Sequence, residues 1–460
     1  MSTLISGDST QAIAELEQGI LDMSSSMPKS AGELGAAAYD VLSAGVQGSA
    51  NQLKVLEASG KLATAGLGDT AGGVDIMTSA INAFGLDAGN ADQIADVLFK
   101  TVKNGKCFAK GTKIMMADGT LKSVEDIKVG EQIMGDDSTP RNVLALGRGK
   151  EMMYKVTNRD GSEYIVNASH LLAVQTPYKK TTITAEEFYN SSNYVKRDYK
   201  GYKTEVNFPE RNDTYEVDPR YLGIWLGDGH SACARVTTMD EQIIQYIHWY
   251  ADELGLGVQV SEMENNNSDT FAISTLRDQK PISLTEKLRD IGVLNNKHIP
   301  EKYKLANEQV RYEVLAGLID TDGWSEGNRQ IGYVSKLEML ADDVQFLARS
   351  LGFFVSKRIK RVSGRNYYEL RITGDIEKIP CLLRRKIEVD DCKHKNPLIG
   401  RIKVERLGVD NYYGFEIDGN HLFVLGDFTV THNTTVDQMA QAFGATAPTL
   451  AAAGISLEDF

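Results

Sequence analysis

The chain has 460 residues, of which 42% are hydrophobic, and carries a formal net charge of −13 at pH 7. This length exceeds what one hydrophobic core usually supports, so we expect two or three domains. The acidic balance argues against a protein that coats nucleic acid along its whole surface. Four cysteines without paired metal-ligand spacing favour a reducing compartment. Because no signal peptide or membrane-spanning run is evident, we expect an intracellular chain.

Residues 1–106 differ in composition from the rest of the chain. They hold no Arg, Cys or His, and their 6 Lys face 12 Asp and Glu. Apolar residues recur there at helical spacing, at Ile13, Leu16, Ile20 and Leu21 and again at Ile94, Val97, Leu98 and Val102. We therefore predict a helical N-terminal segment.

At Cys107 the composition changes, and segments rich in β-branched and aromatic residues follow, separated by turn signals such as Arg159-Asp160-Gly161. Near Val217 it changes again, and residues 221–229 and 243–254 show helical periodicity. Mixed strands and helices are expected to about residue 395.

Strand patterns return at residues 412–431, and the Ala-rich helical texture resumes after Thr434. We therefore interpret the chain as a helical protein, residues 1–106 and 434–460, that is interrupted by an insert of residues 107–433.

The two ends of the insert carry matching chemical signals. CFAKGT opens it at Cys107, and His432-Asn433-Thr434 closes it. With NASH at residues 167–170 and YYG at residues 412–414, these motifs resemble the Hedgehog/intein (Hint) family, and within it most closely the intein of the yeast vacuolar ATPase.

The resemblance implies an all-β Hint splicing domain that is interrupted by a second domain. Its N-terminal part would be residues 107–215, including an insert at residues 178–203 that could contact DNA, and its C-terminal part residues 396–433. Its activity would be autocatalytic protein splicing without a cofactor.

At the first junction the resemblance makes Cys107 the nucleophile. A thiolate attacks a carbonyl more readily than a hydroxyl does, so the preceding peptide bond could become a thioester. Asn167, Ser169 and His170 would polarise or protonate that bond, with His170 as general acid and Asn167 orienting the carbonyl. A histidine satisfied in the β core is the alternative interpretation of His170.

At the second junction Thr434 would accept residues 1–106 onto its hydroxyl. Asn433 would then cyclise onto its own carbonyl and release the insert, assisted by His432. The resemblance also makes His421 a candidate proton shuttle, with a histidine satisfied in the β core as the alternative.

Two further segments, LGIWLGDG at 222–229 and LAGLIDTDG at 315–323, resemble the paired motifs of LAGLIDADG homing endonucleases. Small residues at helical spacing allow two such helices to pack backbone against backbone. The resemblance implies an α/β endonuclease domain at residues 216–395 that cuts double-stranded DNA, with Asp228 and Asp322 as its acids.

Two carboxylates brought that close repel each other unless divalent cations neutralise them, and we expect Mg²⁺. The resemblance implies four metal-binding positions at the ends of the motifs: Gly227, Asp228, Thr321 and Asp322. NKHIP at residues 296–300 resembles the block that supplies a catalytic lysine, which would be Lys297, and Lys336 is a candidate for a second one.

The predicted partner is double-stranded DNA at the intein-free site of the host gene, bound by a monomeric intein. Residues 357–403 hold 14 Lys and Arg against 6 Asp and Glu, a plausible phosphate-binding face. Residues 178–203 alternate basic and Tyr residues, and here a solvated charged face is an equal alternative.

The flanks resemble phage tail tape measure proteins through residues 77–86, 91–98 and 445–448. Such a host would be a helical structural protein that assembles with other phage tail proteins. Splicing is expected in the cytoplasm of a phage-infected or prophage-bearing cell, and the spliced host in the virion tail.

Two alternatives remain. The insert could splice but carry an inactive nuclease, against which the intact Asp228 and Asp322 argue. It could also cleave without ligation, against which the nucleophilic Thr434 argues.

Overall fold

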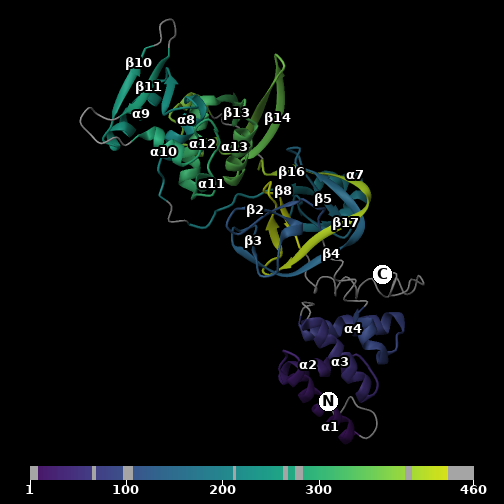
Figure 1. Ribbon diagram of the computed structural model, residues 1–460. Coiled ribbons are helices and arrows are strands. Elements are labelled where there is room, and N and C mark those ends of the chain that lie inside the picture. The colour runs from purple at the N-terminus through teal and green to yellow at the C-terminus, as the bar shows by residue number, and fades with distance from the viewer. Residues whose placement is uncertain are drawn as a thin grey trace.

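The computed structural model describes residues 9–64, 69–96, 107–210, 214–262, 268–274, 283–388 and 396–433. Three bodies follow one another in space (Figure 1): an N-terminal helical bundle, a curved β domain and an α/β domain. The predicted multidomain fold class is confirmed. The helical pattern expected after Thr434 lies outside the described residues.

The described part of the N-terminal bundle comprises α1 (Ser9–Ser26), α2 (Ala31–Ser43), α3 (Ser49–Thr64), α4 (Thr70–Phe84) and the short turn η1 (Ala88–Asn90). Side-chain caps begin two of the helices, since Ser30 accepts a hydrogen bond from the backbone N–H of Glu33 and Asp69 from that of Gly72. Leu16 and Ile20 are buried, whereas Leu21 is exposed.

The β domain is assembled from segments on both sides of the α/β domain. Its described elements are β1 (Lys113–Met115), β2 (Leu121–Ser123), η2 (Val124–Asp126), β3 (Gln132–Met134), β4 (Pro140–Thr157), β5 (Glu163–Asn167), β6 (Leu171–Gln175), β7 (Lys180–Thr184), α6 (Ala185–Asn190), α7 (Asn193–Asp198), β8 (Lys200–Tyr202), β16 (Ile399–Arg401), β17 (Lys403–Ile417), β18 (Leu422–Val424) and β19 (Val430–His432).

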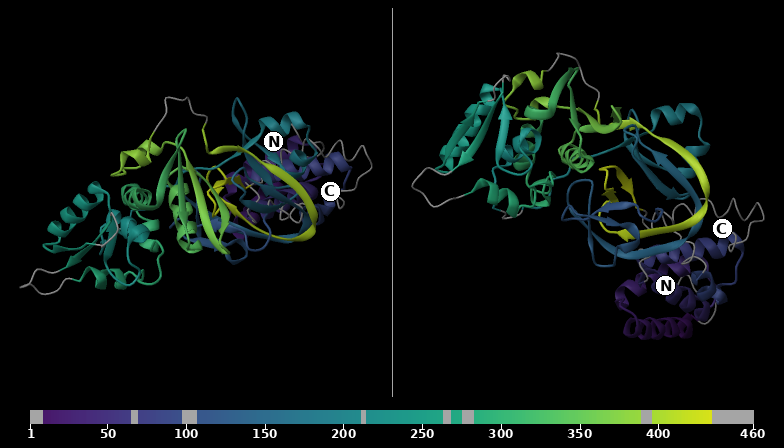
Figure 2. Two further views of the ribbon diagram at one scale, coloured as in Figure 1. Left: turned by 90° about the horizontal axis from the view of Figure 1, so that it is seen from above. Right: turned by 45° about the horizontal axis from the view of Figure 1, so that its top comes forward.

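Long strand β17 joins the two halves of this domain. It pairs antiparallel with β4, which also pairs with β3 and β5, and Figure 2 shows it curving around the domain. Phe108, Tyr154, Phe415 and Phe423 are buried in the core beneath it. Sequence-distant residues of the insert therefore share one core.

The α/β domain consists of two halves, each with a helix leading into a sheet. The first contains α8 (Pro219–Asp228), β9 (Arg235–Thr238), α9 (Glu241–Glu253), β10 (Gly257–Ser261), β11 (Asp269–Ser274) and α10 (Leu284–Asp290). The second contains α11 (Glu301–Lys304), α12 (Glu308–Asp322), β12 (Gly323–Gly327), β13 (Gln330–Ser335), α13 (Glu338–Ser350), β14 (Phe354–Val362), β15 (Arg365–Thr373), η3 (Ile376–Lys378) and η4 (Arg384–Lys386). The sheet orders are β10-β11-β9 and β12-β13-β15-β14.

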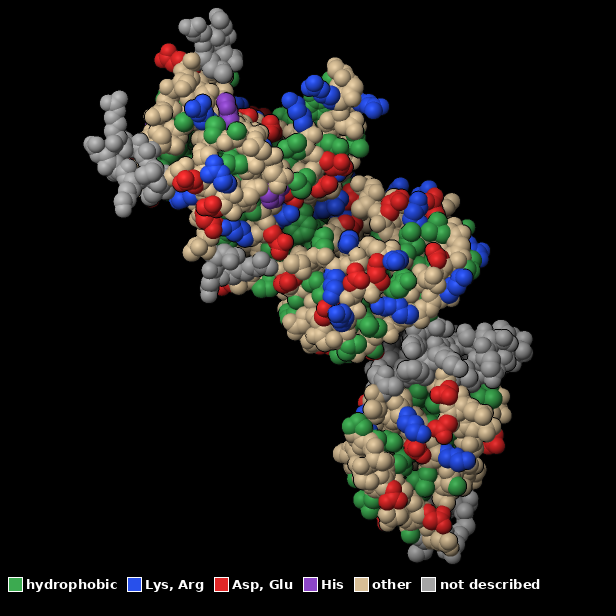
Figure 3. Space-filling model, in the orientation of Figure 1, with side chains coloured by type: hydrophobic (Ala, Val, Ile, Leu, Met, Phe, Trp, Pro, Cys, Tyr) green, Lys and Arg blue, Asp and Glu red, His purple; other side chains and the backbone are tan. Residues whose placement is uncertain are grey.

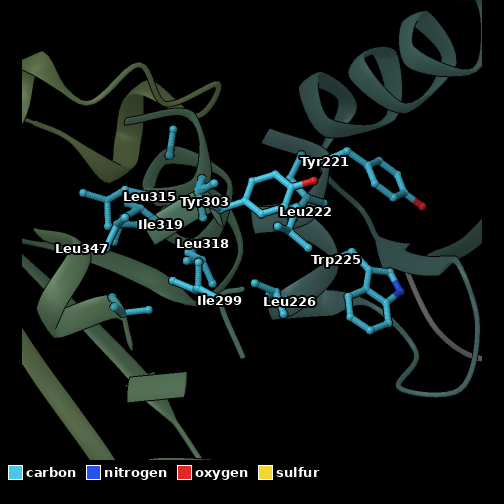
Figure 4. Packing of buried hydrophobic residues seen from close by; sticks show 14 of the residues in the cluster. Tyr221, Leu222, Trp225, Leu226, Ile299, Tyr303, Leu315, Leu318, Ile319 and Leu347 are labelled. Carbon is cyan, nitrogen blue, oxygen red and sulfur yellow. The ribbon is translucent and has the colours of Figure 1, made fainter. Parts of the chain in front are cut away.

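Helices α8 and α12 lie at the centre of this domain. Asp218 caps α8 by accepting from the N–H of Tyr221 at 3.0 Å, and Asn307 caps α12 by accepting from that of Val310 at 3.0 Å. Figure 4 shows their buried side chains gathered with Ile299 and Tyr303. This single core spans both halves and fixes the ends of the two helices against each other.

No helix within the described ranges combines the length and the apolarity that a membrane crossing requires.

Candidate functional site

The first junction is held by Asn167 at the end of β5. The backbone N–H of Cys107, which is the nitrogen side of the peptide bond to residue 106, donates to Asn167 Oδ1 at 2.8 Å. The N–H of Asn167 donates in return to the carbonyl of Cys107 at 3.1 Å. Both residues are buried. The carbonyl of that peptide bond belongs to Lys106, outside the described residues, so the role of Asn167 in orienting it stays a prediction.

A half-buried carboxyl group that the sequence did not point to, that of Glu151, supports Asn167. Asn167 Nδ2 donates to Glu151 Oε2 at 2.6 Å and to Ser169 Oγ at 3.1 Å. Burial raises the pKa of Glu151. Ser169 and Glu151 thus both accept hydrogen bonds from the amide nitrogen of Asn167. These two contacts orient the amide so that its oxygen, Oδ1, faces Cys107.

The predicted acid His170 lies fully buried between the two junction segments. Its Nε2 lies 2.7 Å from Thr431 Oγ1, and its ring meets that of Phe108 edge-on with 4.6 Å between centroids. Phe108 follows Cys107, and Thr431 lies two residues before Asn433. His170 therefore contacts the strands that carry both junctions.

Burial favours the protonated form of the Cys107 thiol. Burial raises its pKa well above the usual range, the negative charge of Glu151 raises it further, and the positive charge of Arg148 opposes them. The thiol must therefore lose its proton as it attacks, which makes proton transfer part of the reaction.

The second junction is held by β17 and by the turn before β18. The N–H of Asn433 donates to the carbonyl of His421 at 2.7 Å, and its side-chain Nδ2 donates to the carbonyl of Phe415. His421 adopts a positive φ of 60°, and its ring centroid lies 6.2 Å from that of His432. His432 and Asn433 are buried, and the predicted nucleophile Thr434 lies outside the described residues.

Strand β17 brings the two junctions together. The N–H and carbonyl of Phe108 exchange hydrogen bonds with those of Tyr413 at 2.7 and 2.8 Å. Two residues farther along the same strand, Phe415 accepts from the side chain of Asn433. Residues 107 and 433 are thus positioned by one strand, the first through its neighbour Phe108, although more than 300 residues separate them in sequence.

The two acids of the α/β domain are the last residues of α8 and α12. Contact between the two helices depends on glycine. A Cβ added at Gly223 would lie 2.3 Å from the carbonyl oxygen of Val314, and one added at Gly317 would lie 2.4 Å from that of Arg220. The two backbones therefore touch, and the helix ends carry Asp228 and Asp322 to the same place.

Close approach of the two acids is reflected in their protonation. Burial and the charge of Asp228 raise the pKa of Asp322 to about 6, and burial raises that of Asp228. A Cβ at Gly227 would lie 2.0 Å from Thr321 Oγ1 and 3.4 Å from Asp322 Oδ2. Gly227 is thus the residue that lets the second acid reach the end of α8.

Two lysines lie over the ends of the helices in matching positions. Lys297 Nζ donates to the carbonyls of Gly227 at 3.0 Å and Gly229 at 2.7 Å, and also to that of Leu226 at 3.0 Å. In the second half, Lys386 Nζ donates to the carbonyls of Thr321 at 3.2 Å and Gly323 at 2.5 Å.

Sequence reasoning missed Lys386 because no motif marks it. Its place depends on Asp320, whose carboxylate accepts from the N–H groups of Leu382 and Leu383, both at 2.9 Å, and so folds this segment back onto α12. Lys336 lines the cavity of ≈ 440 Å³ that also contains Lys297 and Asp322.

The donor set fits a hard divalent cation. Asp228 and Asp322 offer carboxylate oxygens, and no cluster of three or more His, Cys, Asp or Glu able to hold a metal occurs among the residues that the structure describes. Mg²⁺ tolerates such a site because it keeps several waters and binds through one or two carboxylates plus phosphate oxygens. The carbonyls of Gly227 and Thr321 contact the lysine ammonium groups, so their role as metal ligands stays a prediction.

Comparison with protein families assigns the two domains. Residues 107–216 match Hom_end-associated Hint, and residues 309–378 match the LAGLIDADG-like domain. The insert is a Hint–LAGLIDADG intein. The recognition of this family from the motifs is confirmed, and we refer below to the β domain as the splicing domain and to the α/β domain as the nuclease domain. Residues 17–118 match the Phage-related minor tail protein family, which confirms the phage tail likeness of the N-terminal flank.

The curated relatives that match the chain include two with different reach. Replicative DNA helicase DnaB of Mycobacterium intracellulare is 30% identical over 381 residues, which are 72% of this chain and 59% of the relative. The catalytic subunit of the V-type proton ATPase of Candida tropicalis is 45% identical over 80 residues, 15% of this chain and 7% of the relative. The chain thus spans less than two thirds of the length of either relative.

Solved structures with partial likeness include the gp41-1 intein, 26% identical with a TM-score of 0.15 over 17% of this chain and 59% of that one. The homing endonuclease I-DmoI in complex with DNA and Ca is 16% identical, with a TM-score of 0.27 over 36% of this chain and 89% of that one.

Proposed function

We propose that the intein excises itself and joins residues 1–106 to residues 434–460, and that its nuclease domain cuts double-stranded DNA. The observation that carries the splicing proposal is that β17 positions both Cys107 and Asn433. A reaction that must cut two distant peptide bonds and join their outer ends requires both bonds at one site.

At the first junction, Cys107 Sγ attacks the carbonyl carbon of residue 106 and the C–N bond breaks. The proton lost by the thiol is balanced by one gained by the departing amine, and buried His170 is the acid that we assign to this transfer. Asn167 holds the N–H of the scissile bond, so the nitrogen is already oriented before it departs.

At the second junction, the hydroxyl of Thr434 takes the acyl group from Cys107. Asn433 Nδ2 then attacks its own backbone carbonyl carbon, and the bond to residue 434 breaks. The amine of Thr434 that is freed takes the acyl group from its own hydroxyl, which leaves an ordinary peptide bond between the flanks. Bonding of Nδ2 to the carbonyl of Phe415 fixes the side-chain rotamer before this attack. His432 and His421 are the neighbouring groups that we assign to proton transfer there.

Intact mass spectrometry after expression in a reducing cytoplasm tests this proposal. Splicing yields a product of 327 residues beside a ligated product of 133 residues. Cys107→Ala should block cleavage at the first junction, and Asn433→Ala should block cleavage at the second. Two unligated flanks would indicate cleavage without ligation, and an unchanged chain of 460 residues would refute splicing under these conditions.

For the nuclease domain, we propose that Asp228 and Asp322 hold Mg²⁺ and position water and the scissile phosphate. The cation, when bound, neutralises charge that develops on the phosphate and activates water. Lys297 and Lys386 place positive charge beside both acids, where it would stabilise negative charge on the reacting phosphate.

The DNA face that we propose includes the hairpin of β14 and β15. Figure 3 shows basic side chains gathered on this projecting hairpin, where residues 358–366 are exposed. Lys360, Arg361 and Arg365 lie in that exposed stretch. Cutting of DNA that spans the intein-free gene junction, in the presence of Mg²⁺, tests this activity, and binding without cutting would identify an inactive nuclease.

For the host, we propose a tape-measure-like tail protein. The match of residues 17–118 to phage-related minor tail proteins supports this proposal. The spliced product would then assemble with other tail proteins of the virion, after splicing in the cytoplasm of a phage-bearing cell. Co-purification of the ligated product with assembled tails tests the assignment.

A further inference from the structure

Helix α13 of the nuclease domain contacts the splicing domain through a buried ion pair. Arg349, in its last turn, donates from Nη2 to Asp160 Oδ2 at 2.6 Å. Asp160 lies in the turn between β4 and β5, and its side chain is fully buried. A second cation, Lys203 of the splicing domain, lies 2.9 Å from the same carboxylate oxygen.

Lys203 also links this ion pair to Asp427, in the turn between β18 and β19. Lys203 Nζ donates to Asp427 Oδ2 at 2.7 Å and to the carbonyl of Asp427 at 2.9 Å. Ser162 Oγ donates to the same carboxylate at 2.5 Å. Burial alone would raise the pKa of Asp427, but Lys203 and Ser162 hold it well below its usual range.

Charge balance in this cluster depends on the nuclease domain. Asp160 and Asp427 contribute two negative charges, and in the ion pairs of the described residues the splicing domain answers them with Lys203. Arg349 supplies the second cation. Because an uncompensated buried charge is strongly unfavourable, loss of Arg349 should disturb the position of the β18–β19 turn.

An apolar contact holds the same turn. The ring of Phe346, one helical turn before Arg349, meets that of Phe428 edge-on with 5.1 Å between centroids. It also stacks on Phe208 at 6.2 Å. Phe428 has a φ of 69°, a conformation that a bulky residue rarely adopts unless its surroundings impose it.

The turn leads directly into the second junction. Strand β19 begins two residues after Phe428, and its Thr431 contacts His170 Nε2 at 2.7 Å. Asn433 follows the end of the strand. A shift of the turn would therefore displace Asn433, the residue that cyclises.

We propose that helix α13 makes the nuclease domain a structural part of the splicing site, in which Arg349 and Phe346 act as positioning residues for cyclisation of Asn433. This inference rests on the proposed splicing activity. The first junction is held directly by Asn167 and β17, whereas the turn reaches it at one remove through Thr431 and His170, so we expect the first junction to depend less on α13.

The test uses the full chain and measures each junction alone. In a Cys107→Ala background, release of residues 434–460 reports cyclisation of Asn433. In an Asn433→Ala background, cleavage by dithiothreitol reports thioester formation at Cys107. If the parent of the first series releases nothing, the proposed function itself fails, and this outcome is distinct from a failure of the inference.

We expect Arg349→Leu and Phe346→Ala each to slow release of residues 434–460 by about tenfold, a change that corresponds to ~1.4 kcal/mol in the barrier. Thioester cleavage should stay within about twofold of its parent, a range worth less than ~0.5 kcal/mol. Arg289→Leu, at an exposed position of α10, is the matched control and should change neither rate.

A double variant separates charge balance from general damage. Asp160→Asn combined with Arg349→Leu removes both members of the pair, so it should recover part of the rate that Arg349→Leu alone loses. The inference is overturned if Arg349→Leu and Phe346→Ala leave release unchanged, or if they slow both junctions equally, or if the double variant shows no recovery.

Discussion

Replacing Gly317 by alanine should separate the two central helices of the nuclease domain. The added Cβ would lie 2.4 Å from the carbonyl oxygen of Arg220 and 2.7 Å from the backbone nitrogen of Ile224. Both neighbours are backbone atoms of α8, so no side chain can turn aside to relieve the contact. Because ordinary contact begins near 3.4 Å, α12 must retreat from α8 by about 1 Å.

This displacement sets the size of the expected effect. Overpacking of a buried contact costs about 1–3 kcal/mol. At about 2–4 °C per kcal/mol for a domain of this size, the melting temperature of the nuclease domain should fall by roughly 2–12 °C. Asp228 and Asp322 end the two helices, and a misplacement of about 1 Å between catalytic groups can cost about 100-fold in rate.

Thermal unfolding and DNA cleavage with Mg²⁺ measure the two effects on the same protein. Gly408→Ala is the control, because a Cβ at Gly408 meets nothing within 4 Å. It should leave both the melting temperature and cleavage unchanged. A Gly317→Ala variant with the melting temperature and cleavage rate of the parent would refute the claim that these backbones touch.

Four other changes test separate parts of the structure. Asp322→Asn should abolish DNA cleavage and leave splicing intact, as judged by cleavage assays and intact mass. Lys386→Met should slow DNA cleavage by about 100-fold, because one preorganised positive donor beside both acids is lost. Lys336→Met should slow it less. Glu416→Gln should stabilise the excised intein by about 1–2 kcal/mol at pH 8, after allowance for solvent screening of a partly exposed group, with a smaller gain at pH 5.

The sign of the last prediction follows from burial, which raises the pKa of Glu416 to about 7. A carboxyl group whose pKa is higher in the folded state makes its full contribution to the free energy of unfolding when the pH is below its pKa in the unfolded chain. It loses that contribution as the pH rises through about 7. Glutamine stays neutral throughout, so equal gains at both pH values would contradict this cause.

A larger loss from Lys336→Met than from Lys386→Met would reverse the assignment of the second lysine, and loss of splicing in Asp322→Asn would show that the two sites are not independent.

Motifs whose residues have a defined chemical role could be predicted from the sequence. Cys107 and Asn433 stand at defined ends, and glycines at helical spacing before Asp228 and Asp322 predicted helices that touch. Each of these signals is local, because a single segment carries both the reactive group and the residues that shape its backbone. The structure buries Cys107 next to the residue that pairs with β17 and Asn433 just after β19, and it places Asp228 and Asp322, both partly buried, at the ends of α8 and α12.

Residues that act through long-range contacts were not readable. Glu151 reaches Asn167 because β4 pairs with β5, and Lys386 reaches α12 because Asp320 holds the intervening segment. Asp160 was recognised only as part of a turn, although its carboxylate accepts a hydrogen bond from Arg349 of the nuclease domain. Such pairs depend on the register of strands and on the docking of domains, neither of which leaves a spacing pattern in one sequence.

Burial of Cys107 also bears on how the precursor survives before it reacts. The residue is 1% exposed, and burial raises the pKa of its thiol. Oxidants, alkylating agents and small disulfides attack exposed thiolates, so a folded precursor should resist them while an unfolded one should not. The fold thus shields its own nucleophile from the cell, and alkylation with iodoacetamide before and after denaturation would show how complete that protection is.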